Sequence, residues 1–330
     1  MLCFNFWCFG ETMSNDYKIV GFMPSRDLYS QGYPFIEAIY SALHVVDKLY
    51  IIDNSSDSTA DIYKKLYTPR VSIIFKDWKF TNKNTKNGEV IAEVSNYLLK
   101  QIKNDYKQNT YIFYIQANEV IHEDTYELLR EIPKIFPNYK GYLLDYYELF
   151  NTYLYGEQYR LRFAPLSNNI VVDGDGWAMR SLGGFWASFV EFLSTQYYTF
   201  IKYQKFNDGF MQIYSKYRFV YTTKPIFRYS RIFIDNTIEK LKIHNKLFSS
   251  LKFDYQLRKL KSELYSKGKT SKNSKFWLNL INISRMTDTS RREFPNLKLN
   301  LIEHPKIMQP ILNKKRYFVR KNLIEKINNL

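Results

Sequence analysis

Cysteine is nearly absent from this chain of 330 residues, since its two cysteines, Cys3 and Cys8, both lie within the first ten positions. The rest of the chain therefore has no disulfide framework, no cysteine-based metal site and no cysteine nucleophile. A long hydrophobic run is also missing, because no stretch approaches the ~18 apolar residues of a membrane-spanning helix. The apolar start, residues 1–10, lacks the basic beginning and cleavage site of a signal peptide. We therefore expect a cytoplasmic protein, with a disordered lead over residues 1–16 and a native start at Met13.

Acidic residues are scarce in only one part of the chain. The net charge is +16, yet residues 236–330 hold 22 Lys and Arg against 7 Asp and Glu, whereas residues 1–235 hold 26 against 25. Basic and apolar residues mix in 237–266 and 302–312 as they do in amphipathic helices, whose basic face suits anionic phospholipid. A nucleic-acid-binding motif is absent. We therefore expect a basic, mostly helical C-terminal extension, peripheral contact with an anionic membrane surface, and no nucleic acid partner.

Strand-like and helix-like patterns alternate along the first half of the chain. Short apolar runs typical of buried strands are followed each time by apolar residues at helical spacing. This alternation predicts an α/β fold with a mainly parallel sheet flanked by helices. The predicted strands are 18–23, 48–52, 71–75 and 111–115, and the predicted helices are 33–43, 59–67, 88–103 and 124–131.

Polar residues cluster where three of these predicted strands end. The clusters lie at residues 24–27, 53–57 and 116–119. In open parallel sheets, ligands bind outside the carboxyl ends of the strands. The sequence therefore predicts a nucleotide or small-ligand site at this edge of the sheet.

Four motifs stand in order along the chain. The first, within residues 21–47, includes YPFIEAI; the second, at 114–123, reads YIQANEVIHE; the third, at 224–229, reads KPIFRY; the last is His304 with Pro305. In this order they resemble a group of family 2-like glycosyltransferases, whose strings are Y-P-x-x-E-S-I, Y-L-Q-A-D-E-V-x-H-E, K-P-I-Y-H-Y and H-P. The resemblance covers residues 17–310.

The resemblance implies both a fold and a function. The fold is a GT-A Rossmann-like domain, expected over residues 17–235, with the basic extension over 236–330. The function is transfer of a sugar from a nucleoside-diphosphate sugar, with inversion, to a glycan, protein or lipid-linked acceptor. A non-catalytic nucleotide-sugar-binding or scaffold protein that retains the fold is the alternative. An enzyme that synthesises sugar nucleotides is not expected, because its Gly-rich N-terminal phosphate loop is absent.

A donor-binding site is also implied by the resemblance. In GT-A enzymes an acidic residue after the second strand binds the nucleotide base, a position held here by residues 53–59. The same residue types are the preferred helix caps, so a capping role stays open. A helix start with an adjacent lysine, at 86–89, is a natural pyrophosphate site. The donor-binding residues expected are Arg26, Asp53, Asn54, Asp57, Lys86, Gly88, Gln116 and Asn118.

The metal site of GT-A enzymes is altered in this sequence. These enzymes use an acidic motif after the fourth strand to hold Mg²⁺ or Mn²⁺ against the donor phosphates. Here the motif reads Gln116, Ala117, Asn118, so only Asn118 and Glu119 remain as metal ligands, and the site is weakened. Arg228 stands where the group has His; arginine cannot bind a metal but can clamp a phosphate. We therefore expect Arg228 to act as a catalytic cation, with its side chain between Asp53 and Asn118.

An inverting transferase also needs a carboxylate that accepts the proton of the acceptor hydroxyl. Asp175, in the loop VDGDGW at 172–177, is the first candidate for this catalytic base. Asp145 and Glu148 are its competitors. Asp-Gly is also a common turn signal, so a purely structural role of the loop stays open.

Overall fold

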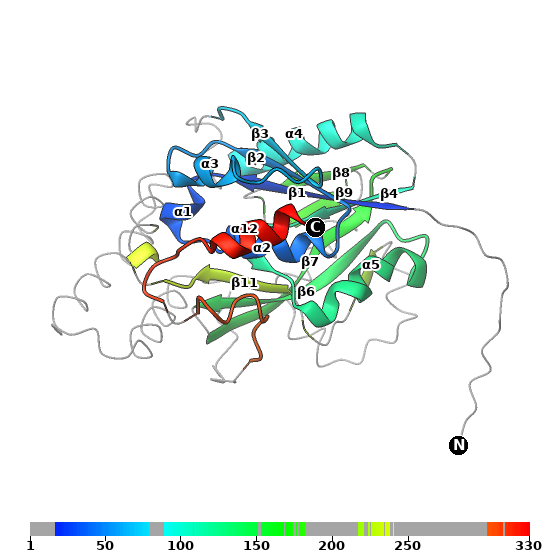
Figure 1. The fold of residues 1–330 in the computed structure, drawn as a ribbon. Coiled ribbons are helices and arrows are strands. Elements are labelled where there is room, and N and C mark those ends of the chain that lie inside the picture. The colour runs from blue at the N-terminus through cyan, green and yellow to red at the C-terminus, as the bar shows by residue number, and fades with distance from the viewer. Residues whose placement is uncertain are drawn as a thin grey trace, which may run out of the picture.

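A computed structural model describes the protein over residues 17–78, 89–107, 109–150, 153–167, 169–173, 176, 178–181, 217–220, 224, 226–233, 235–237, 240, 302–312 and 314–330. In this part of the chain a nine-stranded sheet forms the framework, and a two-stranded sheet accompanies it (Figure 1). The elements of the C-terminal end lie beside those of the N-terminal half in this arrangement.

The large sheet is mixed but mainly parallel, in the order β3-β2-β1-β4-β7-β6-β11-β5, with β10 paired to β6. β1 to β4 run parallel to one another, β7 is antiparallel to β4 and β6, and β11 is parallel to β6. Its strands are β1 (Lys18–Ser25), β2 (Lys48–Asp53), β3 (Val71–Phe75), β4 (Thr110–Tyr114), β5 (Glu119–Val120), β6 (Gly141–Phe150), β7 (Tyr153–Pro165), β10 (Tyr217–Val220) and β11 (Ile226–Arg231). The small sheet pairs β8 (Ile170–Asp173) with β9 (Ala178–Ser181).

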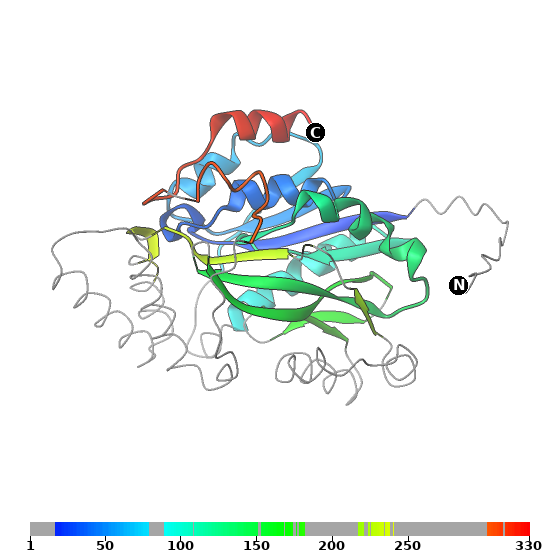
Figure 2. The ribbon, with the colours of Figure 1, turned by 90° about the horizontal axis from the view of Figure 1, so that it is seen from below.

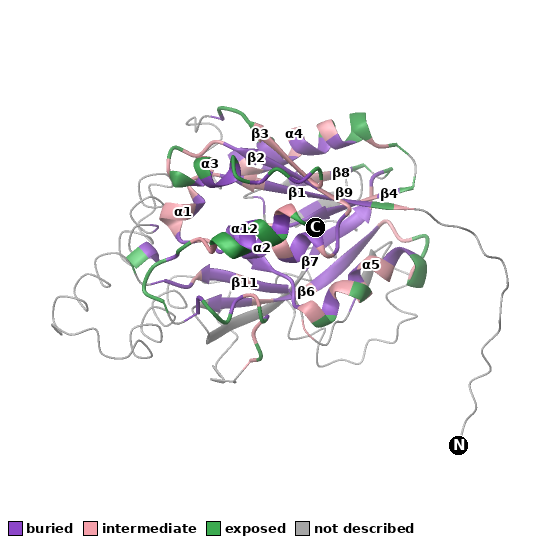
Figure 3. Cartoon of the chain, viewed as in Figure 1, coloured by how far each residue is buried: buried purple, intermediate pink, exposed green. Residues whose placement is uncertain are grey.

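Helices cover both faces of the large sheet. Figure 2 shows α2 and α12 on one side and α4 on the other, and in Figure 3 the strands between them are mostly buried whereas the outer faces of α5 and α12 are exposed. The helices are α1 (Leu28–Gln31), α2 (Phe35–Leu43), α3 (Ser58–Tyr63), α4 (Glu89–Asp105), the 3-10 helix η2 (Glu123–Thr125), α5 (Tyr126–Ile135) and α12 (Lys321–Asn328).

β1 illustrates how alternating side chains build two cores at once. Ile19 and Met23 pack in the core that includes α2, whereas Val20 and Phe22 pack in the core that includes α4. Successive side chains of a strand point to opposite faces of the sheet. A strand covered on both faces therefore reads as a continuous apolar run, as the KIVGFM segment does.

Residues 302–330 pack on the same domain. Tyr317 Oη donates to Glu37 Oε2 at 3.0 Å and Arg320 Nη2 donates to Glu37 Oε1 at 3.2 Å. Burial raises the pKa of Glu37, and the charge of Arg320 partly offsets this effect. The end of the predicted extension is therefore tied to α2, along which it lies in Figure 1.

One sequence-based expectation for this end needs correction. The helical region expected to begin at 302–312 is a series of turns over 306–312, and helix α12 begins only at Lys321. Pro305 and Pro310 explain the difference, because proline has no N–H for the helical hydrogen bond and its ring clashes with the preceding turn.

The predicted α/β class is confirmed, because the described part of the chain forms a mainly parallel sheet flanked by helices. Within the described ranges, every helix falls short of the length or the apolar character needed to cross a membrane. The expected boundary between domain and extension at residue 235 stays a prediction, as does the lead over residues 1–16, which lies outside the described residues.

Candidate functional site

The carboxyl ends of β1, β2 and β4 meet at one edge of the sheet. β1 lies between the other two strands, and its last residue, Ser25, pairs with Asp53 at the end of β2. On its other side, Phe22 accepts a main-chain hydrogen bond at 3.2 Å from Ile115, which follows β4. The three polar clusters of the sequence therefore follow neighbouring strand ends.

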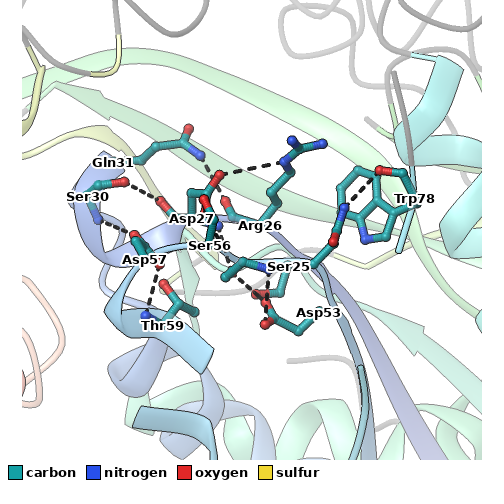
Figure 4. Close-up of polar contacts among 12 residues, drawn as sticks. Ser25, Arg26, Asp27, Ser30, Gln31, Asp53, Ser56, Asp57, Thr59 and Trp78 are labelled. Atoms are coloured by element: carbon teal, nitrogen blue, oxygen red, sulfur yellow. Dashed lines mark hydrogen bonds and ion pairs between the residues drawn. The ribbon is translucent and has the colours of Figure 1, made fainter. Parts of the chain in front are cut away.

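Asp53 holds the ends of β1 and β2 together from within. Its side chain is 1% exposed and Oδ1 accepts hydrogen bonds from Ser25 Oγ and Ser55 Oγ, both at 2.7 Å. Burial raises the pKa of Asp53, while these hydroxyl hydrogen bonds act in the opposite direction. Figure 4 shows the carboxylate beneath the loops. Asp53 therefore shapes the edge from inside.

The two loops above Asp53 brace each other through carboxylates. Asp57 Oδ1 accepts from the Thr59 main-chain N at 2.9 Å, as the N-cap of α3, and its Oδ2 accepts from Ser30 N at 2.7 Å. Asp27, in the left-handed conformation at φ 49°, accepts from Ser56 N at 2.7 Å. The capping role that the sequence left open for Asp57 is thus present, and its carboxylate links both loops (Figure 4).

Arg26 and Asn54 form the more accessible part of this end, and both contact Trp78, which is only 8% exposed. The Arg26 side chain is 32% exposed, and its guanidinium carbon lies 5.6 Å from the centre of the Trp78 ring. Asn54 Nδ2 donates to the main-chain O of Trp78 at 2.8 Å. Figure 4 shows Arg26 beside the indole. A cationic plane next to an aromatic ring and an amide can contact a planar polar ligand. Trp78 was not among the predicted site residues.

Glu119, after β4, is engaged inside the protein. Arg162 Nη2 donates to Glu119 Oε1 at 2.5 Å, and Gln116 N donates to Oε2 at 2.9 Å. The side chains of Arg162 and Glu119 are both 1% exposed. The Arg162 guanidinium also lies over the Tyr114 ring, 4.8 Å from its centre. Arg162 is a site residue that the sequence reasoning missed, although a charged R-L-R run inside an apolar strand was a usable signal.

These residues do not fit a divalent cation. Both oxygens of Glu119 accept hydrogen bonds from within the chain. Asn118 is 4% exposed and uncharged, whereas Mg²⁺ and Mn²⁺ favour carboxylate oxygens. Nowhere in the described part of the chain do three or more His, Cys, Asp or Glu side chains gather as a metal site would require. The role of Asn118 and Glu119 as metal ligands therefore remains a sequence-based prediction, which the geometry does not favour.

Arg228 on β11 stands in a row of alternating charges. In register it pairs with Glu119 of β5 on one side and with Glu148 of β6 on the other. Its Nη1 donates to Glu148 Oε1 at 2.8 Å and its Nε donates to Gln116 Oε1 at 3.3 Å. Burial alone would lower the pKa of Arg228, but the surrounding acidic groups, Glu148, Tyr146, Glu119 and Tyr33, together outweigh it, and the net shift is upward. Arg228 therefore lies next to the end of β4, as a permanent cation with a carboxylate partner.

Gly176, between β8 and β9, contacts the end of β4. Its carbonyl oxygen accepts from Tyr114 Oη and from Gln116 Nε2, both at 2.7 Å. Its φ of +73° is in the left-handed region, and a Cβ atom there would stand 2.4 Å from Ile91 Cγ2. Glycine is therefore required at this contact.

Three predicted site residues, Lys86, Gly88 and Asp175, lie outside the described residues. Of the competitors of Asp175 as the base, Glu148 is 4% exposed and bound to Arg228, and Asp145 is half-buried on β6. Of the predicted donor-binding and metal residues that are described, Gln116, Asn118 and Glu119 follow β4, and Arg26, Asn54 and Asp57 follow β1 and β2.

Comparison with known proteins gives only distant structural similarity. No family model and no curated protein matches the chain. Residues 1–349 of TarS from S. aureus are 11% identical at a TM-score of 0.38, with 82% of this chain and 80% of that chain covered. Glucosyl-3-phosphoglycerate synthase from Mycobacterium tuberculosis, in complex with Mn²⁺, UDP and glucosyl-3-phosphoglycerate, is 12% identical at 0.25, with 46% and 50% covered. The 4-diphosphocytidyl-2C-methyl-D-erythritol synthase of Anaerococcus prevotii is 10% identical at 0.31, with 72% and 99% covered.

Proposed function

We propose that this protein is a glycosyltransferase that moves a sugar from a nucleoside-diphosphate sugar to a glycan, protein or lipid-linked acceptor, with inversion. The observation that carries the proposal is the meeting of β1, β2 and β4 at one edge, where motif residues from separate parts of the chain come together. Ligands of open parallel sheets bind at this edge. The identity of the chemistry rests on the resemblance of those motifs to glycosyltransferases.

The donor is proposed to lie across this edge in two parts. The nucleoside contacts Arg26 and Asn54, whose side chains are partly accessible and which lie against the buried Trp78. The diphosphate lies near Gln116 and Arg228, whose side chains are 3.3 Å apart. Asp53 supports the site through its buried hydrogen bonds.

In the reaction, the acceptor oxygen forms a bond to the anomeric carbon while the carbon–oxygen bond to the diphosphate breaks. The electron pair of the broken bond stays on the diphosphate, and the acceptor proton passes to a carboxylate, proposed from the sequence as Asp175. Arg228 stabilises the charge that develops on the departing oxygen, as preorganised cations do. No step is assigned to Mg²⁺ or Mn²⁺, because the residues at the usual metal position do not fit one.

A ligand screen tests the proposal. Nucleoside diphosphates and their sugars are added to the full chain with and without Mn²⁺, and the thermal midpoint is recorded. A ligand at a hundred times its Kd stabilises the folded chain by about 2.7 kcal/mol. At least one donor should bind and be consumed with an acceptor mixture. Absence of binding across all donors would reject the proposal, and binding without turnover would favour the non-catalytic nucleotide-sugar-binding or scaffold protein.

We also propose that the basic region contacts an anionic membrane surface. The charge balance of residues 236–330 supports this. Because residues 302–330 pack on the domain, deleting the whole region would disturb the core. The sharper test replaces the Lys and Arg between 242 and 298 with Gln and measures binding to vesicles rich in phosphatidylserine. Unchanged vesicle binding would reject the membrane proposal.

A further inference from the structure

Lys240 is a buried lysine next to the proposed diphosphate position. It is 6% exposed, and its Nζ donates to the main-chain O of Ser230 at 2.7 Å. The Nζ also lies 4.2 Å from the centre of the Tyr33 ring. No ion pair joins Lys240 to another residue in the described ranges. A buried ammonium without a carboxylate partner is costly, so this lysine needs a physical explanation.

The charges that face Lys240 are mostly positive. Arg228 and Arg231 come from β11, and Glu148 comes from β6. Glu148 already accepts from Arg228 Nη1 at 2.8 Å and from Ser230 Oγ at 3.1 Å. Burial lowers the pKa of Lys240 well below its ordinary value, the two arginines lower it further, and Glu148 acts in the opposite direction. The surroundings of Lys240 in the free protein therefore disfavour its charged form relative to an exposed lysine.

A chain of contacts connects Lys240 with the ligand-binding edge. Gln116, after β4, accepts from Arg228. Arg228 Nη1 is 3.3 Å from Ser230 Oγ, and Ser230 accepts from Lys240 through its main-chain O. Tyr33, beneath the amine, precedes α2 and follows the turn after α1. The amine is thus connected to Arg228 through Ser230 and lies over Tyr33, in the loop before α2.

We propose that Lys240 and Arg228 together bind the oxyanion of a diphosphate, and that Lys240 takes up a proton as the oxyanion binds. The proton comes from the solvent, bonds to Nζ, and returns when the diphosphate leaves. This added charge takes the place of the divalent cation that the Gln116–Glu119 segment does not hold. The identity of the ligand as a donor diphosphate rests on the proposed function, whereas the oxyanion site itself does not.

The coupling fixes the direction of the pH dependence. At a pH where the free protein has a neutral Lys240, each binding event must add a proton, so affinity falls as pH rises. At lower pH the amine is already charged and affinity levels off. An arginine at this position stays charged at every working pH. Binding to such a variant would neither take up a proton nor weaken at high pH.

The test is calorimetric titration of the full chain with inorganic pyrophosphate, UDP and GDP in the presence of EDTA. Titrations run between about pH 7.5 and pH 8.5, above the pKa of about 6 of a phosphate group. Two buffers of different ionisation enthalpy at each pH give the number of protons taken up. The variants are Lys240→Met, Lys240→Arg and a matched control, Lys48→Met. Lys48 also lies over a tyrosine ring, with 5.2 Å from its Nζ to the Tyr50 ring centre, but at the opposite end of the strands.

The wild type and Lys48→Met should take up protons on binding and lose affinity as pH rises. Lys240→Met should bind about 10- to 100-fold more weakly, the range for a hydrogen bond to a charged group, without proton uptake. Lys240→Arg should bind without uptake or pH dependence. Circular dichroism verifies folding, and if Lys240→Met does not fold, Lys240→Arg decides the matter.

Each alternative outcome has one meaning. Nucleoside diphosphates that bind Lys240→Met and wild type equally overturn the role of Lys240 and leave the proposed function intact. Pyrophosphate binding with proton uptake, but without binding of any nucleotide, supports the oxyanion site and rejects the proposed function. No binding of any probe to the wild type overturns both.

Discussion

The buried pair of Glu119 and Arg162 allows a stringent test of the site as described. Both side chains are 1% exposed and the Nη2–Oε1 distance is 2.5 Å. Arg162→Met keeps an unbranched side chain of similar reach but leaves the Glu119 carboxylate buried without its cation. Breaking one partner of a buried pair costs about 3–5 kcal/mol. Glu119→Gln leaves the Arg162 guanidinium buried without its carboxylate and should lower the free energy of unfolding by a similar amount. The contact of the guanidinium with the Tyr114 ring should make this loss somewhat smaller.

The double variant is the informative one. With both charges removed, the desolvation cost disappears together with the attraction, and replacing a buried pair by neutral residues is often close to neutral. If each single substitution costs about 3–5 kcal/mol and the double variant is close to neutral, the double variant should be less destabilised than the sum of the two singles by a coupling energy of about 6 kcal/mol or more. Urea unfolding followed by circular dichroism gives the free energies of unfolding of the wild type, the two single variants and the double variant. Glu131→Gln, which removes the exposed pair with Lys134, is the matched control and should change stability little.

A coupling energy near zero would refute this reasoning. It would mean that Glu119 and Arg162 do not contact one another in solution. Glu119 would then be available to a ligand, and the main objection to a metal at this position would fall.

Three further predictions concern separate parts of the molecule. Gly176→Ala should lower stability by about 1–3 kcal/mol, from the positive φ and the contact with Ile91, as a shift of the urea midpoint; an unchanged midpoint would show that the loop adapts. Glu37→Gln should remove a pH dependence of stability. Burial raises the pKa of Glu37 above its unfolded value, so the stabilising contribution of this group is full below about pH 4.3 and is lost as pH rises through the folded pKa. Parallel pH profiles of stability for the wild type and the variant would contradict this. Asn118→Asp should acquire Mn²⁺-dependent thermal stabilisation that the wild type lacks, because a carboxylate replaces the uncharged amide that follows β4; equal responses of both proteins would contradict it.

Local sequence patterns were sufficient to predict the strands and the helix that form the ligand-binding edge of the sheet. The KIVGFM and KLYII runs are buried strands because both faces of β1 and β2 are covered, and continuous apolar runs are typical of that position. The helical spacing in YPFIEAIYSAL places Phe35 and Ile36 in the core under α12. The strand ends then follow from the parallel pairing.

Contacts between distant segments could not be predicted from the sequence. Arg162 meets Glu119, and Arg228 meets Glu148, only because β11 and β7 pair with partners far along the chain. In the sequence Lys240 is one of many lysines in a basic stretch. Only the structure shows that it is buried against Ser230 and Tyr33. Whether a cation is buried beside a carboxylate depends on register across the sheet, which a single sequence does not encode locally.

The ambiguity at residues 53–57 has the same cause. Aspartate and serine after a strand suit a helix cap and a ligand contact equally well. Only the packing of the neighbouring loop shows that Ser25 and Ser30 use the carboxylates of Asp53 and Asp57. Arg26, which follows Ser25, and Asn54, which follows Asp53, are instead partly exposed.

The central claim is that this edge binds a nucleoside diphosphate without a divalent cation. Calorimetric titration of the wild type and Arg228→Ala with the nucleoside diphosphate selected by the screen, in EDTA and then in Mn²⁺, tests it most directly. The account predicts equal affinity of the wild type in both conditions and a loss of about 1.5–3 kcal/mol in Arg228→Ala. Binding that requires Mn²⁺ and is indifferent to Arg228 would contradict the account.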